Sequence, residues 1–195
     1  VINRSDFQKL TNSDFENIHK LMRGEAIFST PFIPKPHQVE ALDKAVNHLK
    51  YQNKSRGKII HPCGAGKSLT AYWLTRRLAA NSVLIAVPSL ALVKQTLNTW
   101  ARESMADGSK MSWMAICSDH DVSKVDDPSC QTYDLGISVT TDSNLLASFL
   151  NNSDGKLKVV ITTYQSSDVV CHAAKENGFS FDFGVFDEAH KTVGH

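Results

Sequence analysis

The chain has 195 residues, of which 42% are hydrophobic and 21% are charged, and its formal net charge is +1. This composition is typical of a globular domain with one substantial core and excludes a disordered chain. The small net charge also excludes nucleic-acid binding through overall basicity, so any such binding has to come from local geometry.

Targeting and cysteine patterns are unremarkable in this sequence. No apolar run approaches the roughly 18 residues of a membrane span, and the first residues lack the basic and apolar stretches of a signal peptide. The four cysteines form no Cys-x-x-Cys pair, so we interpret them as reduced thiols. These features predict a cytoplasmic protein that does not contact a membrane.

Helix-forming segments open the chain. A polar helix or helix pair with one apolar side is predicted over 6–23, and an amphipathic helix with Pro36 in its first turn is predicted over 36–49. Short apolar runs then alternate with helical patterns. Strands are predicted at 58–60, 83–87, 113–117, 159–162 and 183–186, and helices at 67–80, 89–103, 143–150 and 167–177.

This alternation predicts an α/β fold, a parallel sheet with helices on both faces, because apolar runs without polar alternation are buried on both sides. The polar stretch 118–157 is irregular and predicts an insertion or long loops. Three aromatic residues lie in apolar stripes and are predicted to belong to the core: Tyr72, Trp73 and Trp100. Ligands of such sheets bind beyond the carboxyl ends of the strands, so the residues that follow each strand are the candidates for a site.

The clearest local signal is Gly64-Ala65-Gly66-Lys67-Ser68, between a predicted strand and a predicted helix. Glycines allow a tight turn that directs backbone N–H groups and a helix N-terminus toward a polyphosphate. Lys67 is predicted to place its charge on the outer phosphates, and Ser68 to offer its hydroxyl to Mg²⁺. His61 stands where the G-x-x-x-x-G-K-[ST] pattern has its first glycine. The alternative is a glycine-rich turn with a solvated lysine.

Two adjacent carboxylates, Asp187 and Glu188, follow the last predicted strand. Neighbouring like charges are unfavourable unless they share a cation, and Mg²⁺ bound by Asp187 would relieve the repulsion. Glu188 would then orient or deprotonate the water that attacks a phosphate. The alternative is an exposed acidic turn, but the phosphate loop upstream favours an ATP and Mg²⁺ site with Lys67 and Glu188 as catalytic residues.

With these motifs in one chain, the sequence resembles the superfamily 2 helicases and translocases of the DEAH type. The resemblance covers residues 33–195 and includes Asp187-Glu188-Ala189-His190 as well as the phosphate loop. It implies a single RecA-like lobe of the P-loop NTPase class over 31–195, preceded by a helical linker over 1–30. It also implies that Gln38, with Phe32 packed nearby, hydrogen-bonds adenine, although Lys35 stands where arginine is more common. The alternative for Gln38 is a surface helix residue.

The same resemblance implies contacts with a nucleic-acid backbone at two strand ends. Residues 87–96 resemble motif Ia, and residues 161–166 resemble a later motif that touches the backbone. The implied contact residues are Pro88, Ser89, Lys94, Thr162, Thr163 and Gln165. Such contacts use N–H groups and hydroxyls and carry no base sequence. The alternative for the serine and threonine residues is that they cap the following helices.

A narrower resemblance is to the predicted helicases attached to bacterial restriction-modification enzymes. It rests on residues 62–64, 86–92, 117–119, 139–142, 163–166 and 187–192, and the 118–157 insertion falls within it. In that family the motor translocates on duplex DNA and is often fused to a nuclease. The resemblance therefore implies duplex DNA, a second RecA-like lobe and a possible nuclease domain as partners.

Three functions remain open at this stage. The first is an ATP-dependent DNA translocase or helicase of a restriction or phage-defence system, and the second is an RNA helicase of the same superfamily. The third is a nucleotide-gated binding module without turnover, against which the intact Lys67 and Glu188 argue. No part of the sequence matches a second lobe, so we expect the isolated chain to be inactive.

Overall fold

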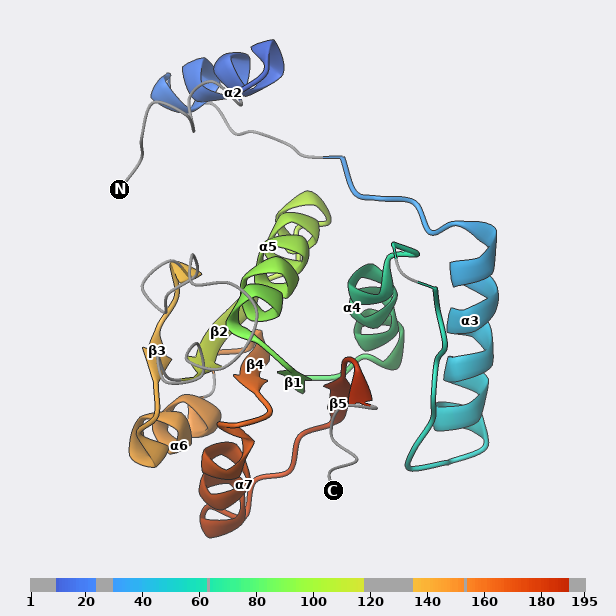
Figure 1. The fold of residues 1–195 in the computed structure, drawn as a ribbon, viewed down its shortest axis with the longest axis vertical. Coiled ribbons are helices and arrows are strands. Elements are labelled where there is room, and N and C mark those ends of the chain that lie inside the picture. Colours follow the sequence, from blue (N-terminus) through green and yellow to red (C-terminus); the bar gives the residue numbers. More distant parts are fainter. Residues whose placement is uncertain (1–9, 24–29, 63, 118–134, 153, 190–195) are drawn as a thin grey trace.

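One parallel sheet organises the part of the chain that the computed structural model describes, which is residues 10–23, 30–62, 64–117, 135–152 and 154–189. Its strand order is β3-β2-β4-β1-β5 (Figure 1). The strands are β1 (Ser82–Val87), β2 (Met111–Ile116), β3 (Val139–Thr140), β4 (Leu157–Thr163) and β5 (Phe183–Phe186). All the strand pairs are parallel, as the alternation of runs predicted.

The described residues also form helices, some of which connect these strands and cover the sheet. They are α2 (Asn12–Met22), α3 (Pro36–Val46), α4 (Lys67–Leu78), α5 (Leu90–Ala106), α6 (Ser143–Asn151) and α7 (Ser167–Glu176), and a π-helical turn (Asn47–Tyr51) extends α3. The predicted helices over 67–80, 89–103, 143–150 and 167–177 are confirmed with shifts of a few residues. Ser89 and Asp142 cap α5 and α6 by accepting hydrogen bonds from the backbone N–H groups of Leu92 and Asn144.

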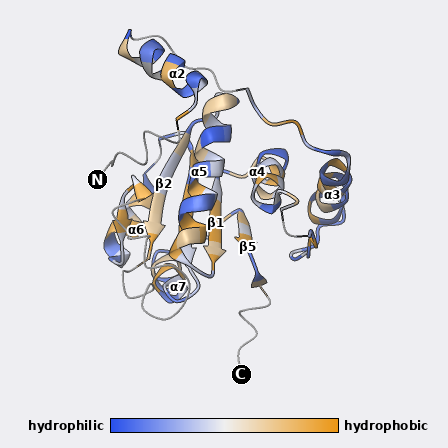
Figure 2. Cartoon of the chain, turned by 45° about the horizontal axis from the view of Figure 1, so that its top comes forward, coloured by the Kyte–Doolittle hydropathy of each residue, from blue (hydrophilic) through white to orange (hydrophobic). Residues whose placement is uncertain are grey.

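Each face of the sheet has its own apolar core. Alternate residues of β1 and β4 pack against α4 and α5 on one face: Val83, Ile85, Val87, Val159 and Ile161 with Tyr72, Val93, Leu97 and Trp100. On the other face β2 and β4 pack against α6 and α7: Met114, Ile116 and Val160 with Leu146, Leu150, Val170 and Ala173. In Figure 2, β1 is coloured as apolar, whereas α3, farther from the sheet than α4, carries many hydrophilic residues. Burial on both faces explains why the predicted runs lack polar alternation.

The aromatic residues predicted for the core are there. Tyr72 and Trp100 are buried and meet edge to face with ring centroids 5.3 Å apart, and Trp73 packs against the same core. The indole Nε1 of Trp100 donates a hydrogen bond of 3.0 Å to the backbone oxygen of Ser68. The core therefore holds the first turn of α4 in place, which matters for the loop that precedes it.

The strand predicted at 58–60 was wrong. Residues 58–60 are exposed and extended outside the sheet, and Ile60 keeps 79% of its surface accessible. A strand needs a neighbour to satisfy its N–H and C=O groups, and 58–60 has no strand beside it in the described part of the chain. The nearest candidate, β5, contributes to the same cavity but pairs with β1.

The N-terminal helix α2 lies apart from the sheet in both views (Figures 1 and 2). Its Phe15 and Met22 are 43% and 80% exposed. The division of the chain near residue 30 stays a prediction, because residues 24–29 lie outside the described ranges. Across those ranges, no helix is long and apolar enough to span a membrane.

The buried carboxylate of Glu103 connects the segment before α3 to helix α5 through hydrogen bonds. Glu103, 1% exposed, accepts hydrogen bonds from the backbone N–H of Phe32 at 3.1 and 3.2 Å and from Arg102 at 3.1 Å. The Arg102 guanidinium also lies over the Phe32 ring, 3.8 Å from its centroid. Phe32 is thus held by α5, and its predicted packing near adenine stays untested.

Replacing Glu103 by alanine is expected to lower the free energy of unfolding by about 2 kcal/mol, because the Phe32 N–H loses its acceptor. Urea denaturation would measure the change. Glu40→Ala is the matched control, since Glu40 is an exposed helical glutamate paired with Lys44 four residues away, and it should change stability little. Equal effects of the two substitutions would contradict the role of Glu103.

Candidate nucleotide-binding site

The phosphate loop adopts the tight turn that its glycines predict. Gly64 and Gly66 have φ angles of 74° and 78°, in the left-handed region, and α4 begins at Lys67 immediately after them. Gly66 is also required by space, because a Cβ there would lie 2.6 Å from Nε2 of Gln38. The first turn of α4 thus presents its N-terminus at the loop, as an anion site requires.

Gln38 braces this loop from helix α3. It is only 3% exposed, which rules out the surface-residue alternative. Its side-chain amide donates a hydrogen bond of 3.0 Å to the backbone oxygen of Ala65, and its Oε1 accepts one of 2.8 Å from the N–H of Lys35. The structure therefore connects α3 to the phosphate loop, while the adenine contact of Gln38 stays a prediction.

Lys67 and Glu188 form an ion pair across 121 residues of sequence. Lys67 comes from the start of α4 and Glu188 from the turn after β5, and their side chains are 32% and 28% exposed. The N–H of Asp187 donates to the backbone oxygen of Ala86 at 3.0 Å, which places this turn beyond the end of β1. Both predicted catalytic residues thus meet at the carboxyl edge of the sheet, and neither the solvated lysine nor the exposed acidic turn is observed.

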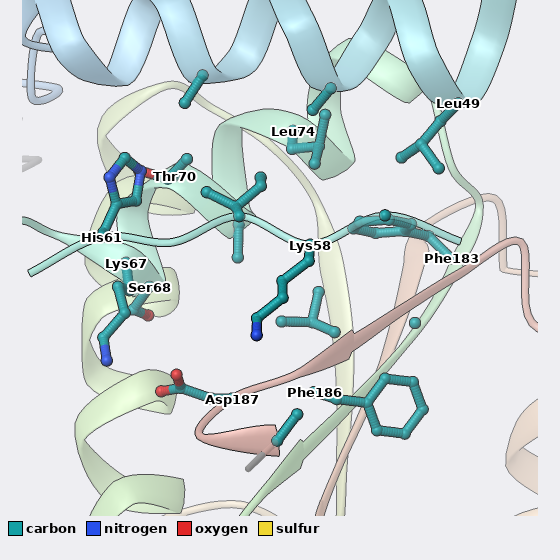
Figure 3. A pocket seen from close by; sticks show the side chains of 18 of the residues that line it. Leu49, Lys58, His61, Lys67, Ser68, Thr70, Leu74, Phe183, Phe186 and Asp187 are labelled. Carbon is teal, nitrogen blue, oxygen red and sulfur yellow. The ribbon is translucent and has the colours of Figure 1, made fainter. Parts of the chain in front are cut away.

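The residues predicted to hold Mg²⁺ line the same cavity as Lys67 (Figure 3). The Oγ atom of Ser68 is buried and has no hydrogen-bond partner among the described residues. A buried hydroxyl without a partner is unfavourable, which indicates that a ligand completes its surroundings. A serine hydroxyl and the Asp187 carboxylate are oxygen donors of the kind that Mg²⁺ takes beside a phosphate, so the donor set fits this ion.

The imidazole of His61 also lies at this site, and the sequence did not predict a role for it. Its Nε2 is buried without a partner in the described part of the chain, and its ring meets that of His37 edge to face at 5.7 Å. Burial, followed by the charges of His37 and Lys67, lowers the pKa of His61 below its ordinary value. His61 is therefore mostly neutral at pH 7 and adds little positive charge beside Lys67. Its only signal in the sequence was its place at the first glycine position of the loop.

The site opens into a cavity of about 2150 Å³ between α3, residues 54–62, α4 and β5. Ligand pockets typically measure about 300–1000 Å³, so this cavity is much larger than a nucleotide needs. Phe186 at the end of β5 is 58% exposed on its wall (Figure 3). One side of a bound nucleotide would therefore face solvent in this structure.

The predicted nucleic-acid contacts come from neighbouring strand ends. β1 and β4 are paired with Val87 opposite Thr163, so the stretches 88–89 and 162–165 lie at the same edge of the sheet. Pro88, Ser89 and Lys94 are partly exposed, and Gln165 is exposed. The structure therefore brings these two groups of predicted residues together.

Two of these predicted contacts need a correction. Thr162 and Thr163 are fully buried, and the Thr162 hydroxyl donates a hydrogen bond of 2.7 Å to the backbone oxygen of Ile116. The Ser89 hydroxyl caps α5, which is the alternative left open for such residues. Both threonine residues are fully buried, backbone included, so the structure contradicts their predicted contacts with a nucleic acid.

Tyr164 joins this edge of the sheet to the acidic turn. Its hydroxyl donates a hydrogen bond of 2.7 Å to the backbone oxygen of Asp187. Only the position of Tyr164 between Thr163 and Gln165 could have indicated this role from the sequence. The side chain thus connects the predicted nucleic-acid edge with the predicted metal site.

Comparison with known families matches residues 31–195 to the family described as the type III restriction enzyme, res subunit. The chain belongs to this family. Comparison with curated proteins gave no significant match. The match to the res-subunit family confirms the recognised superfamily 2 helicase lobe, while the DEAH subtype is not established by it.

Two solved structures are similar to this chain. One is a nuclease-deletion mutant of the Type ISP restriction-modification enzyme LlaGI in complex with a DNA substrate mimic, with 29% identity and a TM-score of 0.65 over 84% of this chain and 16% of that one. The other is the UvsW helicase from bacteriophage T4, with 15% identity and a TM-score of 0.38 over 94% of this chain and 62% of that one. The first match confirms the RecA-like α/β fold. The chain spans less than two thirds of either protein.

Proposed function

We propose that this chain is the ATP-binding lobe of a DEAH-type, ATP-dependent DNA translocase or helicase of a bacterial restriction or phage-defence system. The observation that carries the proposal is the ion pair of Lys67 and Glu188 at the same site as the Ser68 hydroxyl, which is buried without a partner among the residues that the structure describes. Such a constellation provides a phosphate-binding cation, a base and a metal ligand at one sheet edge. The protein would act in the cytoplasm, where its DNA substrate lies.

Different residues of the site would bind the phosphates, accept a proton and hold the metal ion. The loop 64–68 binds the phosphates through N–H groups, and Lys67 leaves Glu188 to bind the outer phosphates. Glu188, released from that ion pair, accepts a proton from water as the water oxygen bonds to the γ-phosphorus and the bond to the bridging oxygen breaks. Bound Mg²⁺, held by Ser68 and Asp187, would supply neutralising charge at the phosphates.

The nucleic-acid partner in this proposal is duplex DNA, bound along the edge formed by Pro88, Ser89, Lys94 and Gln165. A nearly neutral domain would hold DNA there through N–H groups and a single lysine rather than a basic surface. In the whole protein, this lobe would work together with a second RecA-like lobe and a nuclease domain. ATPase stimulation by duplex DNA but not by RNA is the expected result. Stimulation by RNA alone would favour an RNA helicase instead.

Lys67→Ala is expected to weaken ATP binding about 30-fold, since a hydrogen bond to a charged group contributes about 1.5–3 kcal/mol. Titration of the chain with a fluorescent ATP analogue would measure the affinity, and circular dichroism would confirm that the fold is retained. Lys175→Ala, an exposed lysine in the last turn of α7, is the matched control. Unchanged affinity in the Lys67 variant would remove the phosphate loop from the proposal.

A further inference from the structure

Tyr164 lies at the junction of three strand ends. It follows β4 directly, and its backbone N–H donates a hydrogen bond of 3.0 Å to the oxygen of Val87, the last residue of β1. Its hydroxyl donates to the backbone oxygen of Asp187, just beyond β5. The residue after it in the same turn, Gln165, is exposed, whereas Tyr164 itself is partly buried.

The length of the side chain decides which residue can make this connection. β1 lies between β4 and β5 in the sheet, so the two outer strands are about 10 Å apart, or two strand spacings. A serine or threonine hydroxyl after β4 would not cross that distance. The phenol ring of Tyr164 extends past the end of β1 and places a donor at the far strand.

The acceptor of this hydrogen bond belongs to an unusual turn. Glu188 has a φ angle of 52°, a left-handed conformation that costs a residue with a Cβ about 1 kcal/mol or more. Such a conformation persists only where its surroundings fix it. Within the turn, the N–H of Glu188 donates to Oδ1 of Asp187 at 3.0 Å, and Tyr164 fixes the Asp187 carbonyl from outside.

The geometry makes the phenol hydroxyl the donor in this contact, because the backbone carbonyl oxygen of Asp187 can only accept a hydrogen bond.

We propose that the Tyr164 hydroxyl is a positioning group for ATP hydrolysis, which holds the Asp187–Glu188 turn so that the metal ligand and the base face the phosphate loop. The proposal rests on the proposed function for its catalytic consequence. It assigns Tyr164 no contact with ATP, so substrate affinity should be independent of the hydroxyl. Loss of the hydroxyl should slow the chemical step.

Tyr164→Phe tests this, because it removes a single oxygen and preserves the ring. In the protein that carries this chain, kcat for ATP should fall about tenfold, the lower end of the range for groups that orient metal-site residues, while KM stays within about twofold. In the 195-residue chain itself, amide hydrogen exchange of peptides covering 187–189 should accelerate by about fivefold or more.

Tyr72→Phe is the matched control. The Tyr72 hydroxyl also makes a hydrogen bond of 2.7 Å to an aspartate, but its partner is Asp107 at the end of α5. This variant should lose stability without a change in kcat or in exchange at 187–189. Any general effect of removing a tyrosine hydroxyl would appear in both variants.

The outcomes separate the two proposals. Wild-type kcat and exchange in Tyr164→Phe would overturn the positioning role, as would equal losses in both tyrosine variants. Absence of ATPase in the wild-type protein would instead overturn the proposed function. In that case faster exchange at 187–189 would still show that the hydroxyl holds the turn, and unchanged exchange would refute that as well.

Discussion

Replacing Glu188 by glutamine is expected to lower ATP turnover by about 100-fold or more, the scale of a lost general base. The same substitution should tighten ATP binding by about threefold. Lys67 is paired with Glu188 in this structure, and that pair has to break before the lysine can bind phosphates. The pair is partly exposed, so breaking it costs only about 0–1 kcal/mol. Glutamine has nearly the same shape but no charge to hold the lysine.

Two measurements separate these effects. Steady-state phosphate release by the protein that carries this chain gives turnover, and titration with a fluorescent ATP analogue gives affinity. Glu176→Gln, an exposed glutamate beside His172 on α7, is the matched control and should change neither quantity. Near-normal turnover in Glu188→Gln would mean that another group activates the water. Weaker binding would mean that the ion pair does not compete with ATP.

The fold was predictable where local pattern and tertiary environment agree. β1 and β4 contain continuous apolar runs, 83–87 and 159–161, because helices cover both faces, and this is the pattern that the sequence displays. Residues 58–60 show a similar apolar pattern but are exposed. Their hydropathy is consistent with a strand, yet a strand also needs a paired neighbour, and a single run of residues does not contain that information.

The site was predictable at the level of which residues meet. Asp187 and Glu188 follow a strand of the sheet, whose carboxyl ends form the expected ligand edge. Lys67 and Ser68 were identifiable from the glycine-rich loop, although the strand predicted before that loop is absent. The contacts that hold these residues in place were not predictable. The ion pair depends on the left-handed turn at Glu188, and the brace from Gln38 depends on the missing Cβ of Gly66. Both are contacts between segments far apart in sequence.

At the predicted nucleic-acid edge, the residues were identified but the directions of their side chains were not. The resemblance implies that hydroxyls at this strand end contact a nucleic acid, but Thr162 donates its hydroxyl inside the sheet, to the backbone oxygen of Ile116. The neighbouring Tyr164 received no role, although its side chain crosses to the acidic turn. Residue type alone does not indicate whether a strand-end side chain points to solvent or across the sheet. That direction is set by the register of β4 against β1 and β2.

The 195-residue chain on its own is expected to hydrolyse ATP at least about 1000-fold more slowly than the complete motor. The cavity is open, and the side chains of Lys67 and Glu188 remain about a third exposed, so water weakens every charge in the site. In related phosphoryl-transfer enzymes, an arginine that stabilises the transition state contributes about 1000-fold or more. We propose that the second lobe supplies that arginine and closes the cavity.

A phosphate-release assay on the isolated chain, with and without duplex DNA, measures this directly. The Glu188→Gln chain provides the background, because contaminating ATPases would persist in it. The expected turnover is far below one per second and rises little with DNA, since the motor would grip the duplex with both lobes. A rate of about one per second or faster, within the ordinary enzyme range, would show that the residues of this lobe alone complete the catalytic site. The open cavity would then have to close by a movement of this lobe rather than by the arrival of another.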